Sequence, residues 1–527
     1  MQAGSTRLNA ALSIVFLLLI VFGYAVQIAN HGALVLEDDA YYYTVIAHNL
    51  ATTGMSTFDG QTLTNGYHPL WLLVVTGLAK TVGTSPLILA SLEALLATVG
   101  IFCMLTALRS GSVVLAAAFV AIAAILATPV VGHGMEISLL IATLGLFALA
   151  VVRYVETGRG SFWLAATAAL VIGSRIDAAV FVLPILIFAA GSLRRAIPPL
   201  AILALGGAVY AAINFYLFGM PMPVSGAIKS LGGLQVNHVL IDTTLLAFSD
   251  GVTASSFAVF LRFIEGKMLA IFVLALLTLP FARRRSPAGV LLGGFVVGFL
   301  FYAAKLTFGS SWTIWIWYGF PIFIGLHALF VFLDDRNTGL VQAQSRSATF
   351  IAWFASLVFV AAAGTWVAKS NGLGQPPVTT FEAINRKAAV DLAPVLAGAR
   401  VAMGDRAGSF ADAYNGPVTQ IEGLVNDREF YETLKARGDL KALLCQRGVG
   451  YLLAYMPDLG AYDTVDIPAI RPALSQFKSP AVTVAKADEV GRVADLTLFG
   501  PHNNGDGDHY LYAWRLSSSC PSPSANG

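Results

Sequence analysis

Long apolar runs recur along residues 1–368 of the chain, and short polar segments separate them. A helix that crosses the hydrocarbon core of a bilayer needs about 20 predominantly apolar residues. By that measure the pattern predicts a polytopic membrane protein with about eleven transmembrane helices. The predicted spans are residues 11–29, 85–108, 113–131, 137–152, 160–173, 177–191, 197–217, 268–282, 288–306, 316–333 and 348–367.

Composition supports the same class. The chain has 527 residues, of which 57% are hydrophobic and 12% are charged, and its mean hydropathy is +0.72. A soluble globular protein of this length needs a more polar surface, so that class is excluded. The net charge of +2 says little about partners, because the distribution of charge matters more than its sum. We expect the lipid bilayer, and no nucleic acid, among the partners.

Arginines in the short loops predict the orientation of the helices, because cytoplasmic loops carry an excess of Lys and Arg. With the N-terminus inside, every even-numbered span ends in the cytoplasm. The arginines of the short loops then fall on the cytoplasmic side only if residues 69–82 do not cross the membrane. We expect these residues to form an interfacial helix with Trp71 at headgroup level. The first span lacks an A-x-A-like cleavage site and is expected to be a retained anchor. The arginines placed in the cytoplasm are Arg7, Arg109, Arg153, Arg159, Arg194, Arg195, Arg283, Arg284, Arg285, Arg336 and Arg346.

This orientation divides the chain into a transmembrane domain, residues 1–368, and several segments on the outer side. The first outer loop is expected to carry interfacial helices. The outer segments are the first outer loop 30–84, the GHGME loop 132–136, the SRID turn 174–177, the loop 218–267, the turn 305–315 and everything after residue 368.

Composition changes sharply after the last predicted span, where residues 369–380 form a Gly/Pro-rich linker. Beyond it, short β-type runs alternate with helical ones, which predicts a small α/β domain over residues 381–515 on the outer side. Residues 516–527 are expected to be a disordered tail. The GDRAGS segment does not match a phosphate-binding loop, so nucleotide binding is not expected there. For Cys445 and Cys520, either a disulfide or two free thiols fits the sequence.

Three adjacent acids, Glu37, Asp38 and Asp39, follow the first span on the outer side. The segment from Asp39 to Leu50 has helical character, and an Asp at its start is a good N-cap. Capping accounts for one carboxylate and not for three. Clustered like charges repel each other, so at least one of these acids needs a cation, a metal or a raised pKa. A carboxylate at the rim of a membrane cavity is also a suitable general base. We therefore select Asp38 and Asp39 as candidate catalytic residues and expect Glu37 to be a bystander.

Aromatic side chains and a histidine follow the acids in the same loop. Tyr41, Tyr42 and Tyr43 fit an aromatic belt at the membrane interface, and Tyr42 is also a candidate for stacking on a sugar. The segment TNGYHPLW predicts a tight Asn-Gly turn and a helix that begins at Pro69. His68 is a candidate donor to a phosphate or ligand of a metal, and the alternative is a surface histidine that holds the loop.

Ionisable residues at the outer ends of spans are further candidates for substrate binding, because charges at membrane depth face cavities or pair with each other. Glu136 begins a span, where it also suits the helix dipole. Arg175 and Asp177 stand in the SRID turn, either as a mutual ion pair or as ligands. Lys229 and Lys305 are cations that a phosphate needs, although Lys305 also fits snorkelling to the interface.

Residues 310–321, SSWTIWIWYGFP, are rich in aromatic side chains. Most of this segment fits the aromatic belt at the interface. Part of it is expected to wall a cavity, and we select Trp312 as a candidate contact of the substrate.

The order of these motifs is similar to that of a known family. DDAYYY, HNLATTG, FDG and TNGYHPLW follow one another in the first outer loop, GHGME follows the third span and SRID the fifth, and GDRAGSFADAY and IEGLVND lie in the C-terminal domain. This order resembles the GT-C superfamily of polyprenyl-phosphate-dependent glycosyltransferases, and within it the cell-wall arabinofuranosyltransferases of actinobacteria and related bacterial members. The resemblance covers most of the membrane region, and the paired acids are its specific part.

The resemblance implies an inverting glycosyltransferase of GT-C type in a bacterial inner membrane, with an extracytoplasmic C-terminal domain. Such an enzyme moves a sugar, for which a pentofuranose is one candidate, from a polyprenyl-phosphate donor to a hydroxyl of a cell-envelope glycan or glycolipid. An acid of the first outer loop is the base, and this role falls to Asp38 or Asp39. Some members bind a divalent metal at this site, but no clear ligand set identifies one here, and no other cofactor is expected.

Two other functions are compatible with the sequence. The first is a transporter or flippase of a polyprenyl-linked saccharide, which would place its charges near the bilayer midplane. Here most charges cluster at one rim and an outer domain is appended, and both features favour an enzyme. The second is a binding protein without catalytic activity.

Overall fold

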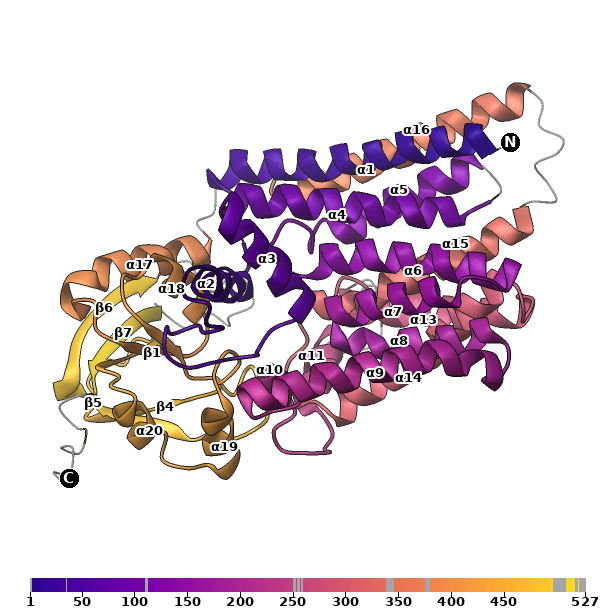
Figure 1. The fold of residues 1–527 in the computed structure, drawn as a ribbon. Helices are drawn as coiled ribbons and strands as arrows, with labels where there is room; N and C mark the ends of the chain where they lie inside the picture. The colour runs from indigo at the N-terminus through magenta and orange to yellow at the C-terminus, as the bar shows by residue number, and fades with distance from the viewer. Residues whose placement is uncertain are drawn as a thin grey trace.

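Figure 1 shows the computed structural model of the chain, in which a bundle of long helices lies beside a mixed α/β domain. This arrangement confirms the predicted fold class, a helical polytopic membrane region followed by an α/β domain. The structure describes residues 2–34, 36–109, 112–249, 253, 256, 259–337, 346–374, 380–495, 509–516 and 520.

Apolar helices make up the bundle, and each of the predicted spans lies on one of them. Within the described residues, 8 helices are long and apolar enough to cross a membrane, whereas α5, α7 and α8 belong to a group of shorter apolar helices. The bundle helices are α1 (Gln2–His31), α4 (Pro86–Ala107), α5 (Val113–Ala127), α6 (Ile137–Thr157), α7 (Ser161–Ser174), η1 (Ile176–Ala178), α8 (Ala179–Ala190), α9 (Leu193–Phe218), α13 (Ile264–Thr278), η3 (Leu279–Phe281), α14 (Pro287–Phe308), η4 (Ile316–Gly319), α15 (Pro321–Asn337) and α16 (Arg346–Ser370).

Helices α4 and α6 approach each other closely at two glycines. A Cβ atom on Gly100 would lie 2.3 Å from the carbonyl oxygen of Ile141, and one on Gly145 would lie 2.3 Å from the carbonyl oxygen of Gly100. Lipid tails are as apolar as the helices, so helices in a bilayer associate through close packing of this kind. The contact fixes α6, whose outer end carries Glu136.

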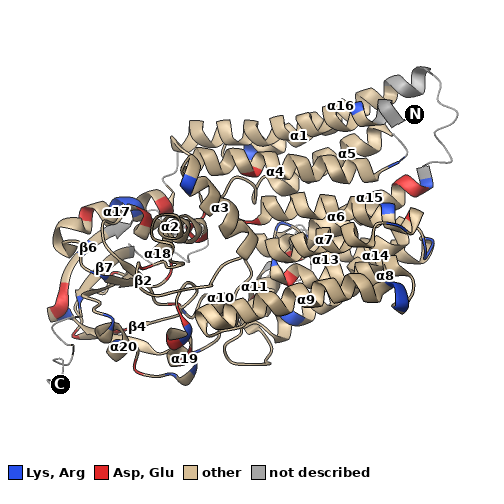
Figure 2. Cartoon of the chain, viewed as in Figure 1, with Lys and Arg blue, Asp and Glu red and all other residues tan. Residues whose placement is uncertain are grey.

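The arginine-rich loops meet at one end of the bundle. The amide of Arg109 donates to Oδ2 of Asp334 over 2.5 Å, and the Arg109 guanidinium pairs with Glu156. At the same end, Nη2 of Arg336 donates to the carbonyl oxygen of Phe281 over 2.6 Å. Figure 2 shows Lys and Arg gathered at this end, away from the α/β domain. Arginines from loops far apart in the sequence thus lie together at the end of the bundle away from the α/β domain.

Short helices lie at the opposite end, between the bundle and the α/β domain (Figure 1). The predicted interfacial helix is one of them, and it begins at Pro69 as predicted. Its Trp71 is fully buried and donates from Nε1 to the carbonyl oxygen of Gly134 over 3.1 Å. The indole therefore packs inside the protein and anchors the GHGME loop, and its level relative to the lipid headgroups stays a prediction. These elements are α2 (Asp38–Thr53), α3 (Pro69–Thr81), α10 (Val224–Lys229), α11 (His238–Leu245) and η2 (Leu246–Phe248).

The α/β domain has a sheet of strand order β2-β1-β3-β7-β6 and a separate β4-β5 hairpin. Strand β1 pairs in parallel with β2 and β3, with Met403 opposite Gln420 and Leu453, and β7 pairs antiparallel with β3 and β6. The alternation of strands and helices predicted from the sequence is thus observed. Its elements are α17 (Phe381–Leu396), β1 (Val401–Met403), α18 (Ala407–Ala413), β2 (Val418–Gln420), α19 (Arg428–Ala436), α20 (Leu440–Gln446), β3 (Tyr451–Pro457), β4 (Thr464–Pro468), β5 (Ala481–Ala485), η6 (Lys486–Asp488), β6 (Glu489–Asp495) and β7 (His509–Arg515).

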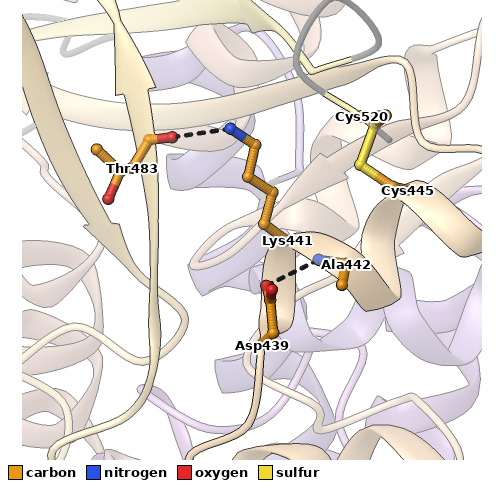
Figure 3. Close-up of a disulfide and its surroundings, with 6 residues drawn as sticks. All are labelled: Asp439, Lys441, Ala442, Cys445, Thr483 and Cys520. Carbon is orange, nitrogen blue, oxygen red and sulfur yellow. Dashed lines mark hydrogen bonds between the residues drawn. A yellow bond between two sulfur atoms is a disulfide. The ribbon is translucent and has the colours of Figure 1, made fainter. Parts of the chain in front are cut away.

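A disulfide joins Cys445, at the end of α20, to Cys520 (Figure 3). The sequence left a bridge and two free thiols open, and the structure pairs the two cysteines. Leu516 is buried, and its amide donates to the carbonyl oxygen of Gly450 over 2.8 Å. The chain therefore stays attached to the sheet beyond residue 515. The other residues of the predicted tail, 517–519 and 521–527, lie outside the described part of the chain.

The first outer loop holds the α/β domain against the bundle. Asp59 and Arg400 form a buried ion pair with 2.8 Å between Oδ2 and Nη1. At Gly66, a Cβ atom would lie 1.8 Å from the carbonyl oxygen of Leu424, so the two backbones touch and only glycine fits. The domain is thereby placed directly over the ends of the bundle helices opposite the arginine-rich loops.

Candidate active site

A cavity of about 590 Å³ lies where α2, the α/β domain and the ends of the bundle helices opposite the arginine-rich loops meet. Eight of the ten site residues predicted from the sequence line it. They come from five outer segments far apart in the sequence: the first outer loop, the GHGME loop, the SRID turn, the loop 218–267 and the end of α14. The eight residues are Asp39, Tyr42, His68, Glu136, Arg175, Asp177, Lys229 and Lys305.

Asp38 does not line the cavity and is bound by the α/β domain instead. Its carboxylate accepts from the amides of Gly408 and Ser409 over 3.1 and 2.7 Å, and from the Ser409 hydroxyl over 2.5 Å. Gly408 and Ser409 lie in the first turn of α18, where amides without helical partners attract a carboxylate. Burial raises the pKa of Asp38 to about 6, although the bonds from Ser409 act in the opposite direction.

Asp39 is the next residue of α2, and it lines the cavity. No hydrogen bond or ion pair to its carboxylate is found among the described residues. Burial raises its pKa to about 7, although the positive charge of Lys229 acts in the opposite direction. Neither aspartate is the N-cap of α2, because Glu37 takes that position and makes no side-chain capping bond. The capping interpretation of the two aspartates is therefore wrong.

The SRID turn forms one wall of the cavity as a chain of alternating charges. Nη1 of Arg175 lies 2.5 Å from Oε1 of Glu136, and its Nε lies 2.9 Å from Oδ1 of Asp177. Nζ of Lys305 continues the chain 3.6 Å from Oδ2 of Asp177. The mutual Arg–Asp pair considered from the sequence is present, and Glu136 completes it. The ring centres of Tyr318 and Phe320 each lie 5.1 Å from the guanidinium carbon of Arg175.

His68 stands at the other end of this chain. Its Nε2 lies 3.6 Å from Oε1 of Glu136, and its buried Nδ1 has no hydrogen-bond partner among the described residues. Tyr43 donates to the second oxygen of Glu136 over 3.4 Å and accepts from the His68 amide. Burial lowers the pKa of His68, which favours the neutral imidazole. The histidine lines the cavity, and its side chain is 26% exposed.

Lys229 brings a positive charge to the cavity near Asp39. Its Nζ lies 5.6 Å from the ring centre of Tyr318 and 6.0 Å from that of Trp312. Burial lowers the pKa of Lys229, but Tyr318 and Asp39 more than offset this, so its pKa is raised and the ammonium is favoured.

Trp312 does not line the cavity. It is buried behind Lys229, and it forms an isolated β-bridge with Ser475 of the α/β domain. Its carbonyl oxygen accepts from the side chain of Asn237 over 3.0 Å. Trp317 and Tyr318 of the same aromatic segment supply the cavity wall that was expected from it.

The residues that escaped the sequence analysis include two from the α/β domain and one acid of the bundle that supports the site. Leu424 and Val425 of the IEGLVND motif line the cavity from the α/β domain. Glu93 of α4 is fully buried and accepts from the Gly134 amide over 3.0 Å, so it fixes the loop that carries Glu136. An acid inside an apolar span was the available signal for Glu93, since such residues are rare without a role.

The described residues contain no group of three or more His, Cys, Asp or Glu side chains arranged to hold a metal ion. Of the acids at or beside the cavity, Glu136 and Asp177 are paired with Arg175 and Asp38 is bound by α18, which leaves Asp39 as a single acid. The side chains present do not fit the metal site that some GT-C enzymes have, and we derive no step through a metal.

Comparison with known proteins gives distant structural likenesses. No protein-family model and no curated protein matches the sequence. The archaeal oligosaccharyltransferase AglB from Archaeoglobus fulgidus, solved with an inhibitory peptide and a dolichol-phosphate, is 12% identical with a TM-score of 0.46, over 84% of this chain and 69% of AglB.

The arabinofuranosyltransferase AftD from Mycobacteria is 15% identical with a TM-score of 0.45. The match covers 97% of this chain and 40% of AftD, so the chain spans less than half the length of that protein. Likenesses at identities and TM-scores this low do not show the function of this chain.

Proposed function

We propose that the chain is an inverting glycosyltransferase of GT-C type that uses Asp39 as its general base. It moves a sugar from a polyprenyl-phosphate donor to a hydroxyl of a cell-envelope glycan or glycolipid, at the outer face of a bacterial inner membrane. A pentofuranose is the sugar that the resemblance to arabinofuranosyltransferases favours.

The observation that carries the proposal is the contrast between Asp39 and the other acids of the cavity. Glu136 and Asp177 are paired with Arg175, whereas Asp39 has no partner among the described residues. Its pKa of about 7 suits a general base, because catalysis is most efficient when the pKa of the base lies near the operating pH. Asp39 is thus an acid that is free to accept a proton.

In the proposed reaction the acceptor hydroxyl gives its proton to the Asp39 carboxylate while its oxygen bonds to the anomeric carbon of the donor. The bond between that carbon and the phosphate oxygen breaks, and the lipid phosphate leaves with the electron pair. Direct displacement from the opposite side inverts the anomeric centre.

The leaving phosphate is stable as an anion, so it needs nearby positive charge more than it needs a proton. Lys229 and Lys305 both line the cavity and can supply that charge. Arg175 is engaged by two carboxylates, and we assign it the task of holding the wall in place. Neutral His68 can donate a hydrogen bond to a phosphate or sugar oxygen.

Two features support an outer-face location. The loops rich in arginine lie at the end of the bundle away from the cavity (Figure 2), as the cytoplasmic side of a membrane protein requires. The α/β domain contains the Cys445–Cys520 disulfide, and such bonds persist in oxidising compartments outside the cytoplasm.

The same arrangement disfavours a transporter. A transporter binds its substrate near the bilayer midplane, often at broken helices. Here Asp39 lies in α2, outside the bundle helices, and the α/β domain supplies Leu424 and Val425 to the cavity wall. A cavity at one rim suits a reaction between a lipid in the outer leaflet and a soluble glycan.

The test is the Asp39→Asn variant of the full chain, reconstituted in lipid with a synthetic polyprenyl-phosphate arabinofuranose donor and, in parallel, a polyprenyl-phosphate mannose donor. We expect transfer to fall by a factor of about 10²–10⁴, as for loss of a general base, with unchanged folding. Glu37→Gln is the matched control, because Glu37 is the adjacent acid and does not line the cavity.

Full transfer by Asp39→Asn would overturn the assignment of the base. Movement of the donor lipid across the bilayer without a new glycosidic bond would favour the transporter. Binding of the donor without transfer or movement by the wild-type chain would point to an inactive binding protein.

A further inference from the structure

A second cavity lies at the edge of the sheet in the α/β domain where the parallel strands end. Strands β1 and β2 run parallel with Met403 opposite Gln420 at their ends, and Asp405 and Glu422 each follow two residues after these ends. Strand β3 runs parallel on the other side, with Leu453 opposite Met403. In open α/β sheets ligands bind beyond the carboxyl ends of parallel strands.

This edge is held close to the candidate base. Helix α18 follows β1, and its first turn binds Asp38, the residue before Asp39. The negative charge of Asp405 contributes to the raised pKa of Asp39, so the two carboxylates lie within electrostatic reach. A ligand at the sheet edge would therefore be a neighbour of a ligand at Asp39.

The second cavity has a volume of about 300 Å³, at the lower end of the range of roughly 300–1,000 Å³ for ligand pockets. Its polar part is the ion pair of Asp405 and Arg471, with 2.8 Å between Oδ2 and Nη1 and side chains 25% and 33% exposed. Most of its other lining is apolar and includes Met456, Pro468 and Pro472.

This lining suits a sugar. A carboxylate beside a guanidinium offers acceptors and donors in fixed planar geometry, which matches the neighbouring hydroxyls of a sugar ring. The apolar side chains provide a surface for the C–H face of the ring. An ion pair that is partly exposed can form hydrogen bonds with such hydroxyls without being broken.

Glu422 lies in the segment that separates the two cavities. Ile421 before it lines the second cavity, and Leu424 and Val425 after it line the first. The Glu422 side chain is 3% exposed; Oε2 accepts from Gln420 over 2.9 Å, and Oε1 has no partner among the described residues. A buried carboxylate oxygen without a partner is costly unless a proton or a ligand group satisfies it.

We infer that the second cavity is a subsite for the acceptor saccharide. It binds a sugar ring next to the one whose hydroxyl Asp39 deprotonates, with Asp405 and Arg471 as the hydrogen-bonding groups and Glu422 between the two rings. The inference rests on the proposed function, because it identifies which part of the chain recognises the acceptor of that reaction.

The test measures binding of the purified full chain, without donor, to an array of arabinofuranosyl, galactofuranosyl and mannosyl oligosaccharides. The variants are Arg471→Met, which removes the guanidinium group, and Arg471→Lys, which keeps the positive charge without the planar pair of donors. Arg492→Met is the matched control, because Arg492 forms an exposed ion pair with Asp458 of the same domain over 3.2 Å. The thermal unfolding midpoint of each variant is measured alongside.

We expect the wild type and Arg492→Met to bind at least one class of oligosaccharide equally well. Arg471→Met should bind it at least tenfold more weakly at an unchanged unfolding midpoint, and Arg471→Lys should fall between them. Equal binding by Arg471→Met, or no binding of any class by the wild type, overturns the inference. If Arg471→Met unfolds, the test rests on Arg471→Lys. Binding by Arg471→Lys that equals binding by the wild type would also overturn the inference.

The two proposals fail separately. Transfer assays with Arg471→Lys should show a raised KM for the acceptor and an unchanged rate of donor hydrolysis by water. If Asp39→Asn retains transfer while Arg471→Lys weakens glycan binding, the base assignment is wrong and the subsite stands. If Asp39→Asn abolishes transfer while Arg471→Lys binds glycans normally, the subsite is wrong and the proposed function stands.

Discussion

The SRID turn and the first turn of α2 face the same cavity, but their charges are arranged differently. In the SRID turn the charge of Arg175 is shared between Glu136 and Asp177, and the three side chains are 3%, 1% and 11% exposed. In α2 the carboxylate of Asp39 lines the cavity without a hydrogen bond or ion pair among the described residues. The same cavity therefore has one wall of paired charges and one acid without a partner among the described residues.

The difference predicts two roles: the paired charges stabilise the fold, and the unpaired acid takes part in the reaction. Buried charges that pair with each other are costly to disturb, because removing one partner leaves the other uncompensated. An acid that no other group holds can take up and release a proton without disturbing its surroundings. Substitutions in the first region should lower stability, whereas substitution of Asp39 should lower transfer without lowering stability.

The largest expected effect is on the stability of Arg175→Met. Loss of the guanidinium leaves Glu136 and Asp177 buried without compensation, which should cost about 3–5 kcal/mol. Denaturant unfolding in detergent micelles measures the loss, with Arg159→Met, an exposed arginine at the other end of the bundle, as the control. Stability equal to that of the control would show that the two regions do not differ in this way.

Asp38→Ala should have the second largest effect. It leaves the amides of Gly408 and Ser409 without their acceptor at a buried contact, at a cost of about 1–3 kcal/mol. The α/β domain should become more sensitive to limited proteolysis, while transfer falls much less than in Asp39→Asn. An Asp38→Ala protein that is inactive and as resistant to protease as the wild type would reverse the roles of the two aspartates.

The pH dependence of transfer tests the unpaired state of Asp39. Its folded pKa of about 7 lies above the ordinary value of 3.8, and only the deprotonated base is active, so transfer should fall about tenfold per pH unit below 7. The folded state also binds this proton more tightly than the unfolded chain, so the group destabilises the fold as pH rises between these two values. Asp39→Asn should lose the pH dependence of transfer and the contribution of this group to the pH dependence of stability, and an identical pH profile in its residual activity would contradict the assignment.

The smallest expected effect is that of Ser409→Ala. The Asp38 carboxylate keeps its bonds from the two amides and loses the one from the hydroxyl, which should cost about 1 kcal/mol. The unfolding midpoint should shift slightly in the direction of Asp38→Ala, with transfer unchanged. A loss as large as that of Asp38→Ala would mean that the hydroxyl is the main contact.

Much of the site could be predicted from the sequence, because its residues stand at the outer ends of apolar spans. Apolar run length and arginine position are local properties, and together they place His68, Glu136, Arg175 and Lys229 at one rim. The contribution of Leu424 and Val425 could not be predicted in this way. They reach the cavity from the α/β domain, and no local sequence pattern predicts which surface of one domain packs against another domain.

Within the first outer loop the sequence determined that acids stand at the outer end of a span and that a helix begins there. Which acid faces the cavity was decided by the tertiary structure. Successive residues of a helix point about 100° apart, so Asp38 and Asp39 face different neighbours. Helix α18 binds the first through its amides, and the cavity is left to the second. The direction of a side chain depends on what packs around the helix, and that is set by segments hundreds of residues away.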